Sequence, residues 1–103
     1  MKKLVSTMRK GFQMTFDNGL TASVQWGAGN YCDNRNTSDF GLYSFSKDAE
    51  SNTAEVAVIY NGELINITPF LTNDQSNDGE VAGWLTPSEI VDFLVRVRDA
   101  KIV

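Results

Sequence analysis

Two runs near the N-terminus alternate apolar and polar residues one by one. The apolar positions are Phe12, Met14 and Phe16 in the first run and Leu20, Ala22, Val24 and Trp26 in the second. A period of two is typical of strands that are buried on one face. The residues Asp17-Asn18-Gly19 separate the runs and are typical of a hairpin turn. The pattern therefore predicts a β-hairpin over residues 12–26.

The length of the turn decides the register of this hairpin. A three-residue loop over residues 17–19 pairs Met14 with Ala22 and places the apolar residues of both strands on one face. A two-residue turn would pair Met14 with Ser23, because a slip of one residue turns every side chain to the other face. We therefore expect the three-residue loop, with Gly19 in the left-handed conformation of a G1 bulge.

A second hairpin is predicted over residues 53–68. Asn61-Gly62 fits a two-residue type I′ turn between two apolar runs. The pairs that this turn predicts are Ile59 with Leu64, Val58 with Ile65, and Val56 with Ile67. Pro69 has no N–H group to donate, so it should end the second strand.

The C-terminal part of the chain predicts one helix. Residues 86–89, Thr-Pro-Ser-Glu, combine a capping box with a proline at the first helical position. Apolar residues then follow at helical spacing at Ile90, Phe93, Leu94 and Val97, with Val91 and Val95 widening the stripe. We expect this stripe to pack on the sheet.

The remaining segments complete the predicted architecture. Residues 40–45 predict a further strand, residues 72–80 a polar loop, and residues 1–10 a basic lead-in that can join the first strand. A length of 103 residues suits one domain, here residues 1–103. The sequence thus predicts an α+β fold, an antiparallel sheet of four to five strands built from two hairpins, with one C-terminal helix packed on a face.

The charge and the hydropathy of the chain exclude several classes of partner. The formal net charge is −4, and the nine Lys and Arg residues lie mainly near the two ends of the sequence. Nucleic-acid binding by bulk electrostatics needs clustered basic residues, so we do not expect it, and a basic partner suits the charge better. No apolar run reaches the roughly 18 residues that span a membrane, and no signal peptide is recognisable. We expect a cytoplasmic protein.

The inventory of reactive side chains argues against an enzyme. The chain has no histidine, and Cys32 is its single cysteine. A nucleophilic cysteine needs a base or a cation, and only Arg35 is near Cys32 in sequence, so a buried, structural Cys32 is expected. Residues 27–29, Gly-Ala-Gly, begin like a dinucleotide-binding motif, but Cys32 takes the place of its third glycine and no helix follows.

A metal site is not expected either. Asp74, Ser76, Asp78 and Gly79 match the first half of a calcium-binding loop, but the twelfth position is Leu85 instead of a glutamate. A zinc site is not expected without histidine and with one cysteine. We therefore predict no enzyme activity, no cofactor and no metal.

The segment from Trp26 to Arg35 is the predicted interaction surface. Trp, Tyr and Arg dominate the hot spots of protein interfaces, and aromatic residues with Asn and Arg can also stack on and hydrogen-bond a nucleobase. The other interpretation is that Trp26 and Tyr31 belong to the core. The predicted binding residues are Trp26, Gly27, Gly29, Asn30, Tyr31, Asn34 and Arg35.

Three stretches carry a resemblance to a known group of proteins. SVQWGAGNYC (residues 23–32), FDNGLT before it and GWLTP before the helix are similar to segments of small uncharacterised proteins encoded by bacteriophages. The resemblance implies an accessory phage protein that binds a host protein in the host cytoplasm. We therefore expect a small non-enzymatic binding protein that inhibits or redirects a host defence or regulatory factor. The alternative is a small-ligand or nucleotide binder that uses the Trp26–Arg35 segment.

Overall fold

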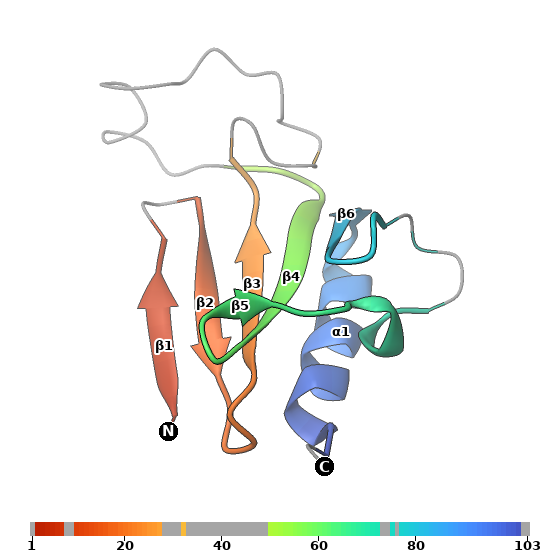
Figure 1. The fold of residues 1–103 in the computed structure, drawn as a ribbon. Coiled ribbons are helices and arrows are strands. Elements are labelled where there is room, and N and C mark those ends of the chain that lie inside the picture. The colour runs from red at the N-terminus through yellow and green to blue at the C-terminus, as the bar shows by residue number, and fades with distance from the viewer. Residues whose placement is uncertain are drawn as a thin grey trace.

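The computed structural model describes residues 2–7, 10–27, 32, 50–72, 75 and 77–101. These residues form a six-stranded antiparallel sheet with one helix on one face (Figure 1), so the predicted α+β fold is confirmed. The strands are β1 (Lys3–Ser6), β2 (Gly11–Thr15), β3 (Thr21–Gln25), β4 (Ala54–Tyr60), β5 (Glu63–Leu64) and β6 (Val81–Leu85). The helices are the 3-10 helix η2 (Thr68–Phe70) and the α-helix α1 (Pro87–Asp99).

The sheet is centred on β3 and β4. The strand order is β1-β2-β3-β4, and both β5 and β6 pair with the remaining side of β4. β5 pairs with the C-terminal end of β4, and β6 pairs with its N-terminal half. β1 therefore forms one edge of the sheet (Figure 1). On the other side of β4, its two ends are paired with β6 and with the short strand β5.

The first hairpin has the predicted register. Phe12 lies opposite Val24, and Met14 lies opposite Ala22. The amide of Gly19 donates to the carbonyl oxygen of Phe16 over 3.0 Å, and Gly19 has a φ of 88°. The three-residue loop with a left-handed Gly19 is thus confirmed, because the apolar face selects this register over a slipped one.

The second hairpin is confirmed at its turn and as far as Ile65, whose amide donates to the carbonyl oxygen of Val58 over 3.0 Å, and it is wrong beyond Ile65. Asn61 and Gly62 have φ values of 52° and 80°, as a type I′ turn requires, and Ile59 pairs with Leu64. The predicted pair of Val56 with Ile67 does not form, because β5 ends at Leu64 and β6 occupies that part of the edge of β4. The backbone of β5 then leads into η2, which begins next to the buried Ile67 and contains Pro69.

The helix begins as its sequence predicts. The side chain of Thr86 accepts a hydrogen bond from the amide of Glu89 at 3.4 Å, and the carboxylate of Glu89 accepts one from the amide of Thr86 at 2.8 Å. This capping box satisfies two N–H groups that would otherwise lack partners in the helix.

The core lies between α1 and the strands β3, β4 and β6. Its fully buried larger side chains are Leu20, Val24, Val56, Val58, Ile67, Leu85, Phe93 and Val97. Ile90 and Leu94 pack against this core, as predicted. The expectation for Val91 and Val95 is wrong, because both side chains are exposed on the flank of α1. The helix packs on the core through the four predicted residues Ile90, Phe93, Leu94 and Val97.

Two strands were not predicted as separate elements. The N-terminal lead-in forms β1, which pairs with β2 so that Leu4 lies opposite Met14. Residues 81–85 form β6. The strand predicted over residues 40–45 lies outside the described residues. In the part of the chain that the structure describes, no helix has the length and apolar character needed to cross a membrane.

Candidate functional site

The predicted interaction surface is described only in part. Trp26 and Gly27 lie within the described residues. The other predicted binding residues, Gly29, Asn30, Tyr31, Asn34 and Arg35, lie outside them. The structure therefore places the start of this segment, at the end of β3.

Trp26 and Gly27 lie in a closely packed corner of the fold. The ring of Trp26 is half-buried and meets the ring of Phe12 edge to face, with 6.1 Å between the ring centroids. Its amide donates to the carbonyl oxygen of Lys10 over 2.6 Å. Gly27 is buried, and a Cβ atom there would come within 2.5 Å of the side chain of Lys10. Trp26 therefore contributes to the packing beside the core, whatever its further role.

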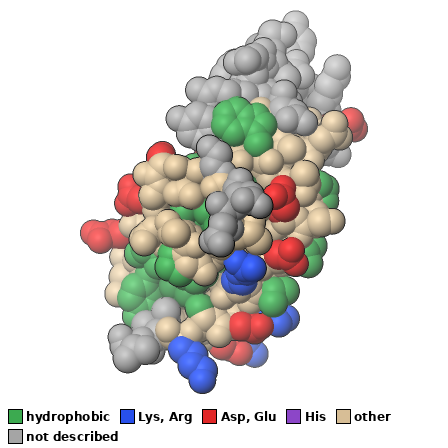
Figure 2. Space-filling view, turned by 90° about the vertical axis from the view of Figure 1, so that its right-hand side faces the viewer, with side chains coloured by type: hydrophobic (Ala, Val, Ile, Leu, Met, Phe, Trp, Pro, Cys, Tyr) green, Lys and Arg blue, Asp and Glu red, His purple; other side chains and the backbone are tan. Residues whose placement is uncertain are grey.

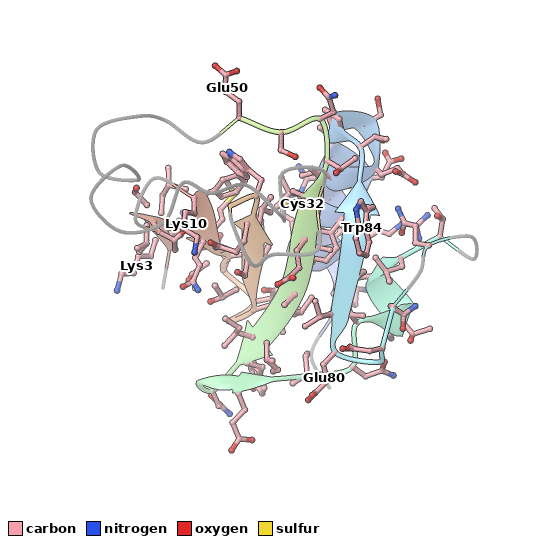
Figure 3. The ribbon with its side chains drawn as sticks, turned by 90° about the horizontal axis from the view of Figure 1, so that it is seen from above. Lys3, Lys10, Cys32, Glu50, Glu80 and Trp84 are labelled. Carbon is pink, nitrogen blue, oxygen red and sulfur yellow. The ribbon has the colours of Figure 1, made fainter. Side chains whose placement is uncertain are left out.

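Cys32 belongs to the same corner. Its side chain is buried, as expected for a structural cysteine, and its thiol donates a long hydrogen bond of 3.7 Å to the carbonyl oxygen of Gly27. Figure 3 shows Cys32 beside the start of β4. Burial and the absence of histidine from the sequence both disfavour a thiolate at this position.

A second candidate surface lies on β6, where the pairing with β4 is irregular. Ala54 lies opposite Leu85 and Val56 opposite Ala82, so the single residue Glu55 faces the two residues between them. Two residues against one define a β-bulge. Bulges occur preferentially at sheet edges and re-aim the side chains of the strand that carries them.

The bulge explains how β6 packs. Ala82 and Leu85 are three positions apart, so a regular strand would turn them to opposite faces of the sheet. Both are nevertheless buried in the core. The extra residue of the bulge turns the side chain of Leu85 back towards the core. It also turns the side chain of Trp84, which lies between Ala82 and Leu85, towards the solvent.

Trp84 has an unusual backbone for its residue type. Its φ is 57°, in the left-handed region, whereas Gly83 just before it does not adopt a positive φ. This region costs a residue with a Cβ atom about 1–2 kcal/mol, and a bulky residue there is a genuine outlier. The side chain is 49% exposed. An exposed aromatic side chain on a strained backbone is the kind of outlier from which function can be inferred.

Acidic residues lie beside β6 and at both of its ends. Glu55 lies opposite the bulge, Glu80 precedes β6, and Glu89 lies in the first turn of α1. The pKa of the Glu89 carboxyl is lowered by the hydrogen bond from the amide of Thr86 and by further bonds from the side chains of Thr86 and Gln75. In Figure 2, which faces this side of the molecule, acidic side chains are spread over the surface and basic ones lie in its lower half.

Asp78 adds to this acidic surface and also shapes the loop before β6. Its carboxylate accepts hydrogen bonds from the amides of Val81 at 2.8 Å and Glu80 at 3.1 Å. These two bonds lower the pKa of Asp78, the bond from Val81 most. Asp78 thus holds the turn into β6, while Asp74 and Ser76 of the calcium-like loop lie outside the described residues. Within the described ranges, no three acidic or sulfur side chains group as a metal site would require.

Sequence reasoning did not select Trp84 as a binding residue. The run Val81–Leu85 lacks the alternation of a strand, because the bulge shifts the period by one residue. The feature of the sequence that could have indicated Trp84 is its position between Gly83 and the helix cap at Thr86. A strand ends and the chain turns at such a position. Only the resemblance in GWLTP drew attention to this stretch.

Comparison of the chain with protein-family models finds no match, and comparisons with curated proteins and with solved structures find none either.

Proposed function

We propose that this protein is a non-enzymatic binding protein that recognises another protein through the outer edge of β6, with Trp84 as its central contact. The observation that carries the proposal is the half-exposed indole of Trp84 on a left-handed backbone. Glycine or asparagine would adopt this backbone at a lower cost. The half-exposed indole on this backbone is therefore our candidate for the central contact with a partner.

The chemistry of the surface indicates the kind of partner. Tryptophan is among the residues most enriched in interface hot spots, where a large side chain enters a pocket of the partner. The acidic residues Glu55, opposite the bulge, and Glu80, before β6, complement a basic surface and accelerate its association. The resemblance in sequence to phage proteins supports the further step that the partner is a host defence or regulatory factor that is inhibited or redirected.

The alternative function is a small-ligand or nucleotide site built on the Trp26–Arg35 segment. It receives less support, because Trp26 packs against Phe12 and Gly27 against Lys10 at the start of that segment. We therefore place the binding surface on β6.

The test compares the protein with a Trp84→Gly variant in quantitative pull-downs from bacterial lysate. Glycine fits the left-handed backbone, so the variant should remain folded while its captured partner falls by at least about tenfold. Leu64→Ala, on the exposed strand β5, provides a control of matched apolar exposure that should retain the partner. Equal capture by a folded Trp84→Gly protein would refute the proposal.

A further inference from the structure

The sheet edge opposite to Trp84 carries an open apolar hollow of about 550 Å³. Its lining includes Lys2, Lys3, Leu4, Met14, Phe16 and Arg98. In Figure 3, Lys3 and Trp84 lie on opposite sides of the molecule, so the hollow is separate from the β6 surface.

The hollow exists because α1 covers only part of the sheet. The backbone of the helix lies close to β3, β4, β6 and η2, but among the described elements it does not come close to β1 or β2. From the helix, the side chain of Arg98 lines the hollow. Leu4 lies opposite Met14, and Met14 lies opposite the buried Ala22, so these side chains share the face on which the helix packs. Leu4 is nevertheless 69% exposed. The apolar face thus continues past the helix and remains uncovered.

The backbone beside the hollow can accept another strand. β1 ends the strand order and, within the described residues, pairs on one side only, with β2. Its outer edge therefore presents N–H and C=O groups along four residues. Extended peptides bind such edges by β-augmentation, in which main-chain bonds give affinity and pockets for alternate side chains give specificity.

The charges around the hollow select the occupant. Lys2 and Lys3 are exposed, and Asp17 lies 3.7 Å from the ammonium of Lys2 in an exposed ion pair that contributes little. Arg98 is bonded to Asp99 over 2.7 Å, so Lys3 and the weakly paired Lys2 supply most of the remaining positive charge at the rim. This end is basic in a chain of net charge −4. The rim therefore complements an acidic partner.

The same charges disfavour a second copy of this chain as the occupant. A second copy of β1, with Lys2 before it, would bring two more lysines and no acidic residue to this edge. Like charges across paired strands are destabilising, and lysines on an edge strand are a common means of preventing such pairing. The lysines attract an acidic segment of a different protein, whereas they repel the lysines of a second copy.

We propose that β1 binds an extended segment of a second protein, which adds to the sheet as an outer strand. An apolar side chain of this segment fills the hollow against Leu4 and Met14, and its Asp or Glu side chains lie near Lys2 and Lys3. The surface lies at the other edge from Trp84, so the proposal does not depend on the one made for β6. With both surfaces occupied, the domain would join a basic partner to an acidic one.

The test uses fluorescence anisotropy of the full chain with a dye-labelled nine-residue peptide that alternates isoleucine and glutamate. A second peptide carries lysine in place of glutamate, and a third carries proline at its centre, which removes main-chain donors. We expect saturable binding of the glutamate peptide that weakens with added salt, and at least about tenfold weaker binding of the other two.

Variants of the chain locate the binding. Two variants should each weaken binding of the glutamate peptide by about tenfold or more. One is the single substitution Leu4→Ser, and the other is the double substitution Lys2→Glu with Lys3→Glu. Leu64→Ser and Trp84→Gly, at the opposite edge, should leave it unchanged. Leu4 and the lysines are exposed, and a melting curve of each variant checks that it folds.

Several results would overturn the proposal. They are no binding of the glutamate peptide, equal binding of the lysine peptide, and full binding by folded Leu4→Ser protein. A dimer in sedimentation equilibrium that dissociates on the Leu4→Ser change would also overturn it, because the occupant would then be a second copy.

Discussion

The side-chain amide of Asn18, in the turn between β2 and β3, donates a hydrogen bond to the carbonyl oxygen of Val97 in the last turn of α1, over 2.8 Å. The same nitrogen lies 2.9 Å from the carbonyl oxygen of Ala100. Its side-chain oxygen accepts from the amide of Leu20 at 3.0 Å, which fixes the direction of the amide group. The last carbonyl groups of a helix have no partner within it, so Asn18 caps α1 from a distant part of the chain.

Replacing Asn18 by alanine should lower the free energy of unfolding by about 1–3 kcal/mol, because helix carbonyl groups and the amide of Leu20 lose a partner together. Urea denaturation followed by circular dichroism measures the change. Asp17→Ala provides the neighbouring control, since Asp17 makes an exposed ion pair with Lys2 and its loss should cost less than about 0.5 kcal/mol. Equal effects of the two substitutions would contradict the capping role.

The backbone at Trp84 can be tested separately from binding. Trp84→Gly and Trp84→Ala remove the same indole, but only alanine keeps a Cβ atom in the left-handed region. The glycine variant should therefore be more stable by about 1 kcal/mol, measured as the difference in the free energy of unfolding. An alanine variant that is as stable as the glycine variant would show that the left-handed conformation is not held in solution.

Gly11 of β2 packs against the backbone of β3. A Cβ atom at this position would overlap the carbonyl oxygen of Val24, which is backbone and cannot move aside. Gly11→Ala should cost about 2–3 kcal/mol of stability. Gly27→Ala is the matched comparison, since its Cβ atom would meet the flexible side chain of Lys10 and should cost less. Thermal melts show which of the two variants loses more stability.

The capping box predicts a dependence of stability on pH. Because folding lowers the pKa of Glu89, its charge stabilises the fold above the ordinary glutamate pKa of about 4.3, and this contribution is lost as the pH falls through the lower folded value. Glu89→Gln keeps the shape of the capping box but not its charge. The variant should be less stable than the unaltered protein by about 0.5 kcal/mol at neutral pH.

The difference between the two proteins should shrink towards zero as the pH falls below 4 in melts at successive pH values. Glu63→Gln, at an exposed carboxylate beside the second hairpin turn, is the control for the loss of one negative charge from the surface. A constant difference between the unaltered protein and Glu89→Gln across the acid range would exclude the charge as its cause.

Local patterns predicted those parts of the fold that are local in sequence. The first hairpin, with its left-handed Gly19, and the capping box at Thr86 depend on residues within a few positions of each other. β6 could not be read in the same way, because its bulge places both Ala82 and Leu85 in the core and so breaks the alternation.

The contacts between distant segments were beyond the reach of these patterns. Nothing around Asn18 indicates that its side chain meets the end of α1, since the bond joins residues that lie far apart in sequence. The exposure of Val91 likewise depends on how far the sheet extends beneath the helix. The exposure of Leu4 depends on how far the helix extends over the sheet. The site residues Gly29 to Arg35 remain a prediction.

β4 pairs with β3 on one side and with β5 and β6 on the other. This position has a consequence for synthesis of the protein on the ribosome. β4 can pair with β3 as soon as both have left the exit tunnel, but its other edge is completed only by β6, and the core only by α1. At about 5–20 residues per second, the nascent chain would expose the apolar face of Val24 and Val56 for a second or more. A translating cell would meet this domain first as a half-covered sheet, the form that chaperones recognise.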